Sequence, residues 1–520
     1  MFQLSNLFVF SALLEFAVES ARILAVLPVP SISHQIVYRP LTQELARRGH
    51  EVTVITPDPA FPKGKTPPNL TEIDVHDSYK IWTATLNKIP KNKERNVLEE
   101  VKLFLDLGCE VSDAELSHED VKALIKSKKE DYVDLLIIEA SETIFLGYSY
   151  IFKAPVILIS SLSLSYDEID MIGAAIHPIL YTSINRIKNS YDLTLWDKIK
   201  EFYNYYKYLK MHEKYEMRKH AMLKKHFGPE VPPISVLKNN IDMFFVNVNP
   251  IFEGVRPVPP SVVYIGGLHH KPNKELPIEL KSYLDTSKNG VIYISFGTNV
   301  DPTLLPGDRI EVLVKTLSQM PYDVLWKWNG DVLPGRTDNI RIAKWLPQQD
   351  LLGHPKMKLF ITQGGLQSTD EAIIAGVPLI GIPMFGDQIF NVERYVYHKI
   401  GLKLDLDTLT VEQFRNAIET VIGNESYRQN VVSLRNKMYD LPQPPLERAV
   451  WWTEHVLRHG GARHLRGPAA NMSWTEYLEL ELVSILLLGL FTVLTLSILV
   501  MYFTWKCVLS KYLRIKIKGD

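Results

Sequence analysis

A glycine turn before a predicted helix is the first feature whose residue types could do chemistry. Residues 358–361 read as a strand, Gly364 and Gly365 as a turn, and 366–375 as a helix that Gly376 terminates. Glycines at a helix N-terminus let a diphosphate approach backbone N–H groups, and the helix dipole favours the negative charge. The segment therefore suits a nucleotide-diphosphate leaving group, although many helices begin with glycines for packing reasons alone.

A histidine near the N-terminus is the candidate general base. The strand predicted at 22–27 leads through a short turn into a helix predicted at 35–48, with Ser33 as N-cap and His34 at the helix start. The positive end of the helix dipole disfavours imidazolium at that place. A neutral imidazole is the form that removes a proton near neutral pH. His34 is thus suited to deprotonate a hydroxyl.

The 44-residue string from Trp345 to Gln388 carries a family resemblance. It reads WLPQQDLLGHPKMKLFITQGGLQSTDEAIIAGVPLIGIPMFGDQ. This string closely resembles the signature of the UDP-glycosyltransferase family, which contains the glucuronosyl- and glucosyltransferases of detoxification. The resemblance extends from Ala21 through the C-terminal tail. The sequence Thr-Gln-Gly-Gly-Leu-Gln-Ser-Thr within the string is most similar to that of the insect members. It implies a GT-B fold, in which two Rossmann-like, doubly wound α/β domains face a cleft, and a UDP-sugar donor.

The resemblance also implies roles for individual residues by position. Trp345 would stack on uracil, Gln348 would hydrogen-bond it, and Glu371 would hold the ribose hydroxyls. Asp387 and Gln388 would read the sugar hydroxyls. The residues implied to meet the phosphates are Ser295, Thr298, Thr362, Gln363, Gly364, Gly365 and Gln367.

Gln363 departs from the family pattern, since most relatives carry histidine there, although glutamine is similar to the insect members. An amide can donate a hydrogen bond to a phosphate oxygen but adds no positive charge. Leaving-group stabilisation would therefore depend on backbone N–H groups. We expect no metal and no further cofactor, and we interpret the Asp405-Leu-Asp407 spacing as a turn before a helix capped by Thr410.

His34 matches the catalytic histidine of the family. A base of this kind needs an orienting carboxylate, and Glu139, where the family usually has aspartate, is the candidate. Glu142 is the alternative. The resulting mechanism is direct displacement at the anomeric carbon with inversion of configuration.

The elements that must position these residues form two strand-and-helix series. Apolar strands are predicted at 22–27, 51–56, 134–138, 155–159 and 242–247, and again at 291–296, 323–328, 341–344, 358–361 and 378–382. We expect an acceptor-binding domain at 21–266, a polar linker at 267–290 and a donor-binding domain at 291–460. A cleft between the strand carboxyl ends is the expected site.

The chain ends predict a membrane protein of the secretory route. Residues 1–20 indicate a signal peptide, with an uncleaved anchor or a core segment as alternatives. A juxtamembrane segment at 461–481 precedes an uncharged transmembrane helix at 482–505, and a basic tail at 506–520 belongs in the cytoplasm. Its lysines resemble an endoplasmic reticulum retention signal, and ordinary stop-transfer charge explains them equally well. We expect a single-pass type I protein with lumenal domains.

Donor sugar and acceptor are less well specified. Glucuronosyl members place an arginine near the strand at 242–247, where this chain has Asn247, so we expect glucose; nearby Arg256 keeps glucuronate open. A small lipophilic acceptor is expected, with specificity in loops at about 57–130 and 160–210. An aromatic-rich stretch at 172–210 would lie on a membrane, roof that pocket or pack on its own domain. A non-catalytic membrane binding protein is the competing class.

Composition excludes other classes. The 58 basic residues nearly cancel the 59 acidic residues, which argues against a nucleic-acid partner. Cys109 and Cys507 are too few for a disulfide framework. N-glycosylation acceptors are predicted at Asn69, Asn424 and Asn471. The sequence does not specify whether the protein is a homo-oligomer.

Overall fold

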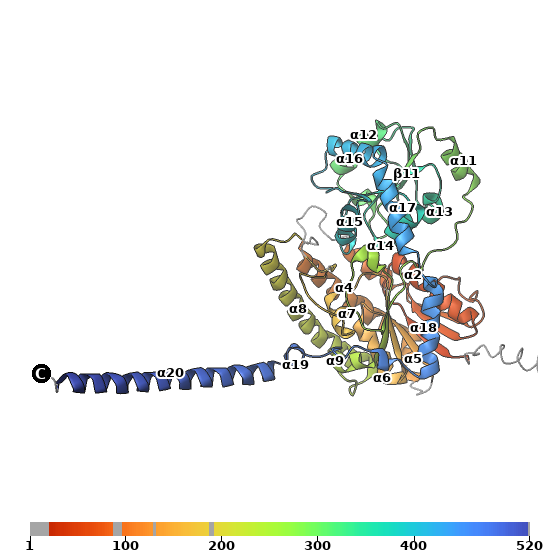
Figure 1. The fold of residues 1–520 in the computed structure, drawn as a ribbon. Helices are drawn as coiled ribbons and strands as arrows, with labels where there is room; N and C mark the ends of the chain where they lie inside the picture. The colour runs from red at the N-terminus through yellow and green to blue at the C-terminus, as the bar shows by residue number, and fades with distance from the viewer. Residues whose placement is uncertain (1–19, 87–95, 128–131, 182, 187–191, 518–520) are drawn as a thin grey trace, which may run out of the picture. The chain divides into compact units, whose positions relative to one another are not determined.

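The computed structural model describes residues 20–86, 96–127, 132–181, 183–186 and 192–517, and it divides at Gly467 into two units. Residues 1–19, which carry most of the predicted signal peptide, and the last three residues of the basic tail lie outside the described residues. The larger unit contains two parallel sheets with helices around them (Figure 1).

The first sheet has seven parallel strands in the order β3-β2-β1-β4-β5-β6-β7. Its strands are β1 (Arg22–Val26), β2 (Glu51–Thr56), β3 (Leu70–Asp74), β4 (Leu135–Glu139), β5 (Val156–Ser160), β6 (Ile241–Val246) and β7 (Val262–Tyr264). Its helices are α2 (Ile32–Arg47), α3 (Ser78–Leu86), α4 (Val97–Leu116), α5 (Glu119–Ser127), η1 (Thr143–Leu146), α6 (Gly147–Phe152), α7 (Tyr166–Met171), α8 (Leu195–Phe227), α9 (Ile234–Leu237), η2 (Lys238–Asn240) and α10 (Pro250–Glu253). Strands β4 and β5 are buried along their whole length, as expected for strands covered on both faces.

The second sheet has six parallel strands in the order β10-β9-β8-β11-β12-β13. Its strands are β8 (Val291–Ser295), β9 (Asp323–Lys327), β10 (Ile340–Ala343), β11 (Met357–Thr362), β12 (Leu379–Gly381) and β13 (Gly401–Lys403). The helices after β7 are α11 (Ile278–Thr286), η3 (Pro302–Leu304), α12 (Gly307–Ser318), α13 (Gln348–Leu352), α14 (Leu366–Ala375), α15 (Gln388–Tyr397), α16 (Val411–Gly423), α17 (Ser426–Met438), α18 (Pro445–His459) and η4 (Arg463–Leu465). In both sheets the strand order reverses beside the first strand, which is the point where doubly wound sheets bind ligands.

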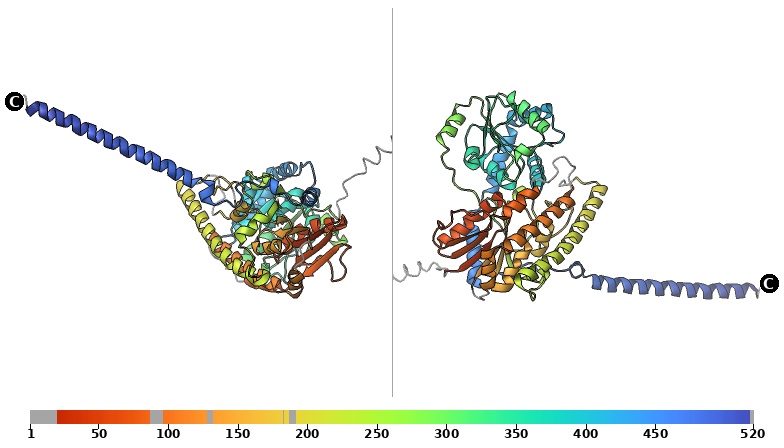
Figure 2. Two further views of the ribbon diagram at one scale, coloured as in Figure 1. Left: turned by 90° about the horizontal axis from the view of Figure 1, so that it is seen from below. Right: turned by 180° about the vertical axis from the view of Figure 1, so that it is seen from behind.

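Helix α18 returns to the first sheet. It lies in the range expected for the donor-binding domain, but it packs against α2 of the first domain (Figure 2). Its Val450 and Val456 are fully buried in the same cluster as Leu41 of α2. Burying two valines contributes roughly 3 to 6 kcal/mol relative to exposure. Helix α18 is therefore part of the packing of the first sheet.

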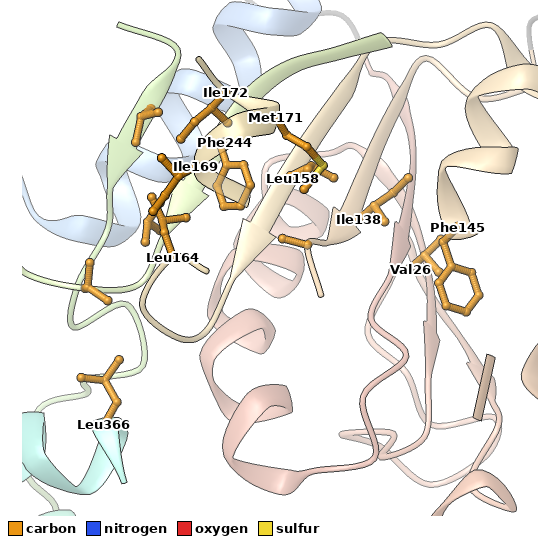
Figure 3. Packing of buried hydrophobic residues seen from close by; sticks show 14 of the residues in the cluster. Val26, Ile138, Phe145, Leu158, Leu164, Ile169, Met171, Ile172, Phe244 and Leu366 are labelled. Atoms are coloured by element: carbon orange, nitrogen blue, oxygen red, sulfur yellow. The ribbon is translucent and has the colours of Figure 1, made fainter. Parts of the chain in front are cut away.

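The predicted linker at 267–290 contains a helix in its second part. Residues 278–286 form α11, and Leu280 and Leu284 on this helix are buried in the largest apolar cluster. That cluster also contains Leu366 at the start of α14 together with Leu164 and Ile169 from the first domain (Figure 3). Apolar contact thus joins the two domains beside the expected cleft.

The smaller unit, 468–520, contains α19 (Trp474–Tyr477) and α20 (Leu480–Ile517). The most apolar window of the Leu480–Leu513 segment of α20 has a mean hydropathy of 2.6, and none of that window is buried. By length and composition this helix could cross a membrane.

Candidate active site

A cavity of about 620 Å³ lies where the carboxyl ends of both sheets meet. His34 and Glu139 line it, and so do ten of the twelve predicted donor-binding residues. Thr362 and Gly364 are the two that do not. The fold therefore brings together side chains that the sequence separates by more than 300 positions.

The base candidate His34 contacts Glu139. The His34 Nδ1 lies 2.6 Å from Glu139 Oε1, and the two side chains are 13% and 2% exposed. Glu139 also accepts hydrogen bonds from the Tyr38 hydroxyl at 2.9 Å and from the Val29 backbone N–H at 3.1 Å. These contacts hold a buried carboxylate at one ring nitrogen and leave the other nitrogen of His34 for a substrate.

Glu142, the alternative carboxylate, has a different partner. Its Oε2 lies 3.4 Å from the Lys219 Nζ, and both side chains are nearly inaccessible. Burial raises the pKa of Glu142, and Lys219 opposes that rise. Of the two candidates, Glu139 is the one in contact with His34.

The turn from β1 into α2 fixes the position of His34. The N-cap is Ser31 instead of the predicted Ser33, so the helix begins at Ile32 and His34 lies in its first turn. Gln35 donates hydrogen bonds to the carbonyls of Leu27 and Val29, which ties the turn to the helix. The first turn of a helix and the end of a buried strand thus meet at His34 and Glu139.

The turn after β11 requires glycine at position 364. Gly364 has φ +92°, and a Cβ there would lie 2.4 Å from a Val392 methyl group. The Thr362 hydroxyl accepts a hydrogen bond from the Gly364 N–H at 3.3 Å. Thr362 and Gly364 therefore shape the turn, while Gly365 and Gln367 line the cavity.

Two further residues that the sequence interpretation missed support this turn. Asn391 of α15 donates to the Gly364 carbonyl at 2.9 Å and to Asp387 Oδ2 at 2.7 Å. Gly297 packs so closely on Gln363 that a Cβ would lie 2.3 Å from its amide nitrogen. Neither residue type has a spacing signal, because both act across loops that only the fold brings together.

The residues that are expected to bind the nucleoside are already ordered by hydrogen bonds. Gln348 donates to Glu371 at 2.7 Å and to the Ser368 hydroxyl at 2.9 Å, and it accepts from the Tyr293 hydroxyl at 3.1 Å. Burial raises the pKa of Glu371 to about 7, and Gln348 opposes the rise. Trp345 is 64% exposed, and the Lys327 ammonium lies over one face of its ring, 5.3 Å from the centroid.

Asp387 and Gln388, which are expected to read the sugar hydroxyls, also line the cavity. Gln388 Oε1 accepts from the N–H groups of Met384 and Phe385, which leaves its amide N–H₂ for a ligand. Burial raises the pKa of Asp387, and the hydrogen bond from Asn391 and the charge of His34 oppose that rise. A hydrogen-bond acceptor and a donor therefore lie side by side in the cavity lining.

Side chains also connect the two domains directly at the cavity. Asn299 donates to the Ser31 hydroxyl at 3.0 Å, and Gln367 donates to the Ser161 carbonyl at 3.0 Å. Gln367, implied by resemblance to meet a phosphate, thus already bridges the domains. Ser31 and Asn299 were not among the predicted site residues.

Part of the remaining cavity wall is apolar, while Asp167, Glu168 and His212 make another part polar. Trp82 of α3, Val101 and Phe104 of α4, and Phe385 line the apolar part. These residues come from the segment near 57–130 in which specificity was expected, and from the second domain. In the aromatic stretch, Tyr208 lines the cavity, whereas Trp196 is 63% exposed.

The three predicted glycosylation sites and the Asp-x-Asp spacing lie away from the cavity. Asn69 and Asn424 are exposed and Asn471 is half-buried. The Asp407 N–H donates to Asp405 at 2.9 Å, and Thr410 caps α16, which is the turn that the sequence indicates.

Comparison with known proteins agrees with this architecture. A family model described as UDP-glucoronosyl and UDP-glucosyl transferase matches residues 22–515. An ecdysteroid UDP-glucosyltransferase of Spodoptera littoralis nuclear polyhedrosis virus is 35% identical, over 91% of this chain and 95% of that protein. UDP-glucosyltransferase 2 of Dactylopius coccus is 32% identical over 94% and 93%, and human UDP-glucuronosyltransferase 2B7 is 29% identical over 89% of each chain.

The fold is that of GT-B glycosyltransferases. The crystal structure of a UDP-glucose:anthocyanidin 3-O-glucosyltransferase in complex with UDP superposes with a TM-score of 0.57 at 19% identity, covering 85% of this chain and all of that one. The kitacinnamycin glycosyltransferase gives a TM-score of 0.56 at 17% identity, with 85% and 99% covered. With a family match along nearly the whole sequence, this chain belongs to the UDP-glycosyltransferase family and is a transferase enzyme that uses a UDP-sugar donor.

Proposed function

We propose that the chain transfers glucose from UDP-glucose to a hydroxyl of a small lipophilic acceptor, with inversion at the anomeric carbon. The observation that carries this proposal is the 2.6 Å contact between His34 and Glu139 in a cavity that the donor string also lines. A base on one domain thus faces a donor site on the other.

The proposed reaction is a single displacement. The second ring nitrogen of His34, Nε2, takes the proton of the acceptor hydroxyl while Nδ1–H stays bound to Glu139. The acceptor oxygen forms a bond to the anomeric carbon as the bond from that carbon to the UDP oxygen breaks. UDP leaves with the electron pair towards the start of α14, and attack from the opposite face inverts the configuration.

Stabilisation of UDP is assigned to groups of the chain itself. The N-terminus of α14 presents backbone N–H groups and a partial positive charge to the diphosphate. Gln363 adds a neutral amide, whose N–H₂ group can donate to a phosphate oxygen. We propose that the transfer step uses no metal.

The cavity charges support a neutral sugar. Carboxyl groups of Glu139, Glu371 and Asp387 line the cavity, and an anionic sugar would be repelled by those that are ionised. Its only arginine or lysine side chains among the described lining residues are Arg39, which pairs with Asp58 at 2.7 Å, and Lys327, which donates to the Gly297 carbonyl.

Asn247 lies outside the cavity lining, so it supports a neutral sugar less directly than the cavity charges do. Asn247 is fully buried and accepts from the Leu268 N–H at 3.4 Å, and neither it nor Arg256 lines the cavity. An arginine at 247 would need rearrangement to reach a sugar. The preference for glucose therefore rests on the carboxyl groups that line the donor end.

We further propose that the protein is a single-pass type I protein of the endoplasmic reticulum membrane with lumenal catalytic domains. The apolar Leu480–Leu513 span and the lysines at its C-terminal end support this topology. The apolar cavity wall formed with Trp82 and Phe104 supports a lipophilic acceptor.

The test is UDP release from UDP-glucose and from UDP-glucuronate by microsomes that express the chain, with a mixture of phenols and sterols as acceptors. We expect faster release from UDP-glucose, and we expect His34→Ala to abolish release while UDP-glucose still binds. Faster turnover with UDP-glucuronate would refute the donor assignment. Equal loss of donor binding in His34→Ala would refute the role of His34, and release in neither case would favour a binding protein.

A further inference from the structure

Two adjacent histidines and a carboxylate meet outside the cavity. His269 and His270 follow β7 at the start of the linker, and Asp370 lies in the middle of α14. One ligand atom of each lies within 4.8 Å of the other two. His269 is 5% exposed and Asp370 is 2% exposed. The cluster therefore joins the linker to the helix whose N-terminus faces the donor diphosphate.

The imidazole of His269 is the unusual member of this cluster. Neither of its ring nitrogens has a hydrogen-bond partner among the described residues. The Gln367 carbonyl faces the ring and opposes the lowering of its pKa by burial, but it does not reach hydrogen-bond geometry. Leaving a buried polar group unsatisfied is destabilising, so such groups usually have a partner. His269 is therefore a buried imidazole whose ring nitrogens have no hydrogen-bond partner among the described residues.

The ring of His270 is oriented by a second residue. Its Nε2 lies 2.9 Å from the Tyr439 hydroxyl, and its Nδ1 is buried with no partner among the described residues. If Nε2–H donates to Tyr439, then Nδ1 carries the lone pair. Metal-binding histidines commonly use their other nitrogen in this way. Gly267 permits the close approach, because a Cβ there would lie 2.9 Å from the His270 ring.

We propose that His269, His270 and Asp370 bind one Zn²⁺ ion. Two imidazoles and one carboxylate are a donor set that suits Zn²⁺, whereas Mg²⁺ and Ca²⁺ prefer oxygen ligands throughout. Neighbouring ligands on tetrahedral Zn²⁺ are about 3.4 Å apart. The three ligand atoms, which lie within 4.8 Å of one another, would therefore move closer by up to about 1.4 Å, and a water molecule would complete the tetrahedron.

The proposed ion is structural. It would fasten the linker to α14 behind the donor site, and none of its three ligands lines the cavity. It takes no part in the displacement, so zinc binding and glucosyl transfer are separable properties.

The test uses the full-length chain purified in detergent, stripped with a chelator and titrated with Zn²⁺ against a chromophoric competitor. We expect one ion per chain, an increase in thermal midpoint on addition of Zn²⁺, and a weakening of affinity by at least about tenfold in Asp370→Asn and in His270→Gln. Tyr439→Phe keeps all three ligands and should weaken binding by about 10- to 100-fold, because only the orientation of His270 is lost. Stripped protein loaded with Co²⁺ should show the visible absorption of a four-coordinate ion, and Asp370→Asn should lose it.

His459→Gln is the matched control, because it removes an exposed histidine next to His455 on α18. Its zinc affinity should equal that of the wild type. Loss of binding in this control, no binding by the wild type, or unchanged affinity in Asp370→Asn and His270→Gln would each overturn the proposal. If either ligand variant fails to fold, as judged by circular dichroism, Tyr439→Phe decides: unchanged affinity in that variant refutes the site.

Discussion

Replacement of Glu139 by glutamine tests the central contact of the proposed mechanism. Glu139 accepts three hydrogen bonds, two at Oε1 from His34 and Tyr38 and one at Oε2 from the Val29 N–H. Glutamine offers only one oxygen. If that oxygen keeps the Val29 bond, its N–H₂ group faces His34 and forces the proton onto Nε2, where the imidazole can no longer act as a base.

The expected loss follows from charge and tautomer together. When His34 takes a proton, the imidazolium and the Glu139 carboxylate attract each other by about 4 kcal/mol, for charge centres about 4 Å apart at an effective dielectric of about 20. That free energy corresponds to about 10³-fold in rate. An amide that selects the wrong tautomer lowers kcat by about 10⁴-fold in the serine hydrolase triad. We therefore expect kcat of Glu139→Gln to fall by about 10³- to 10⁴-fold.

The assay is steady-state UDP release with a single phenolic acceptor, combined with calorimetric titration of UDP-glucose. Donor affinity should change by less than about threefold, because the recorded partners of Glu139 all belong to the first domain. Glu142→Gln is the control, since Glu142 pairs with Lys219, and its kcat should stay within about tenfold of wild type. A Glu139→Gln enzyme with more than about a tenth of the wild-type kcat would refute the reasoning.

Three further predictions concern the sugar, the domain contact and the topology. Burial raises the pKa of Asp387, so its carboxylate is lost as the pH falls through that raised value. Loss of the carboxylate should weaken the binding of UDP-glucose but not of UDP. The dissociation constant of UDP divided by that of UDP-glucose should therefore decrease on acidification in the wild type and not in Asp387→Asn. Ser31→Ala removes an interdomain hydrogen bond worth about 1 kcal/mol and should raise KM about fivefold with Tm nearly unchanged; an unchanged KM would show that this contact does not support closure. Glycans at Asn69 or Asn424 should give an endoglycosidase-sensitive shift, and protease added to sealed microsomes should remove only about the last 15 residues; digestion within 345–388 would contradict the lumenal placement.

The central elements of both sheets could be predicted from sequence. Strands such as β4 and β8 are continuous apolar runs that are buried on both faces, so their composition alone identifies them. Helix α14 begins and ends where the glycines predict, at Leu366 and Ala375. Most of the predicted cavity-lining residues came from the segment Trp345 to Gln388, because it is one contiguous segment with a characteristic sequence.

The elements that escaped prediction lack such local signals. Strands β3, β7 and β13 are short or lie at sheet edges, where polar residues such as those of Leu70–Asp74 resemble a loop. The contact of Ser31 with Asn299 joins positions 268 apart. Local patterns do not encode which distant loops meet. For the same reason, the sequence did not show that Asn247 lies outside the cavity lining.

The return of α18 to the first domain has a consequence for biosynthesis. Leu41 on α2 is translated early, yet the helix that covers this face of α2 begins roughly 400 residues later, which at about 5 to 20 residues per second is roughly 20 to 80 seconds of synthesis. During that interval the first domain presents an uncovered apolar surface in the compartment where it folds. The nascent chain should therefore depend on chaperones until Pro445–His459 has emerged, and shortened transcripts that end before this helix should yield insoluble protein even though the donor string is intact.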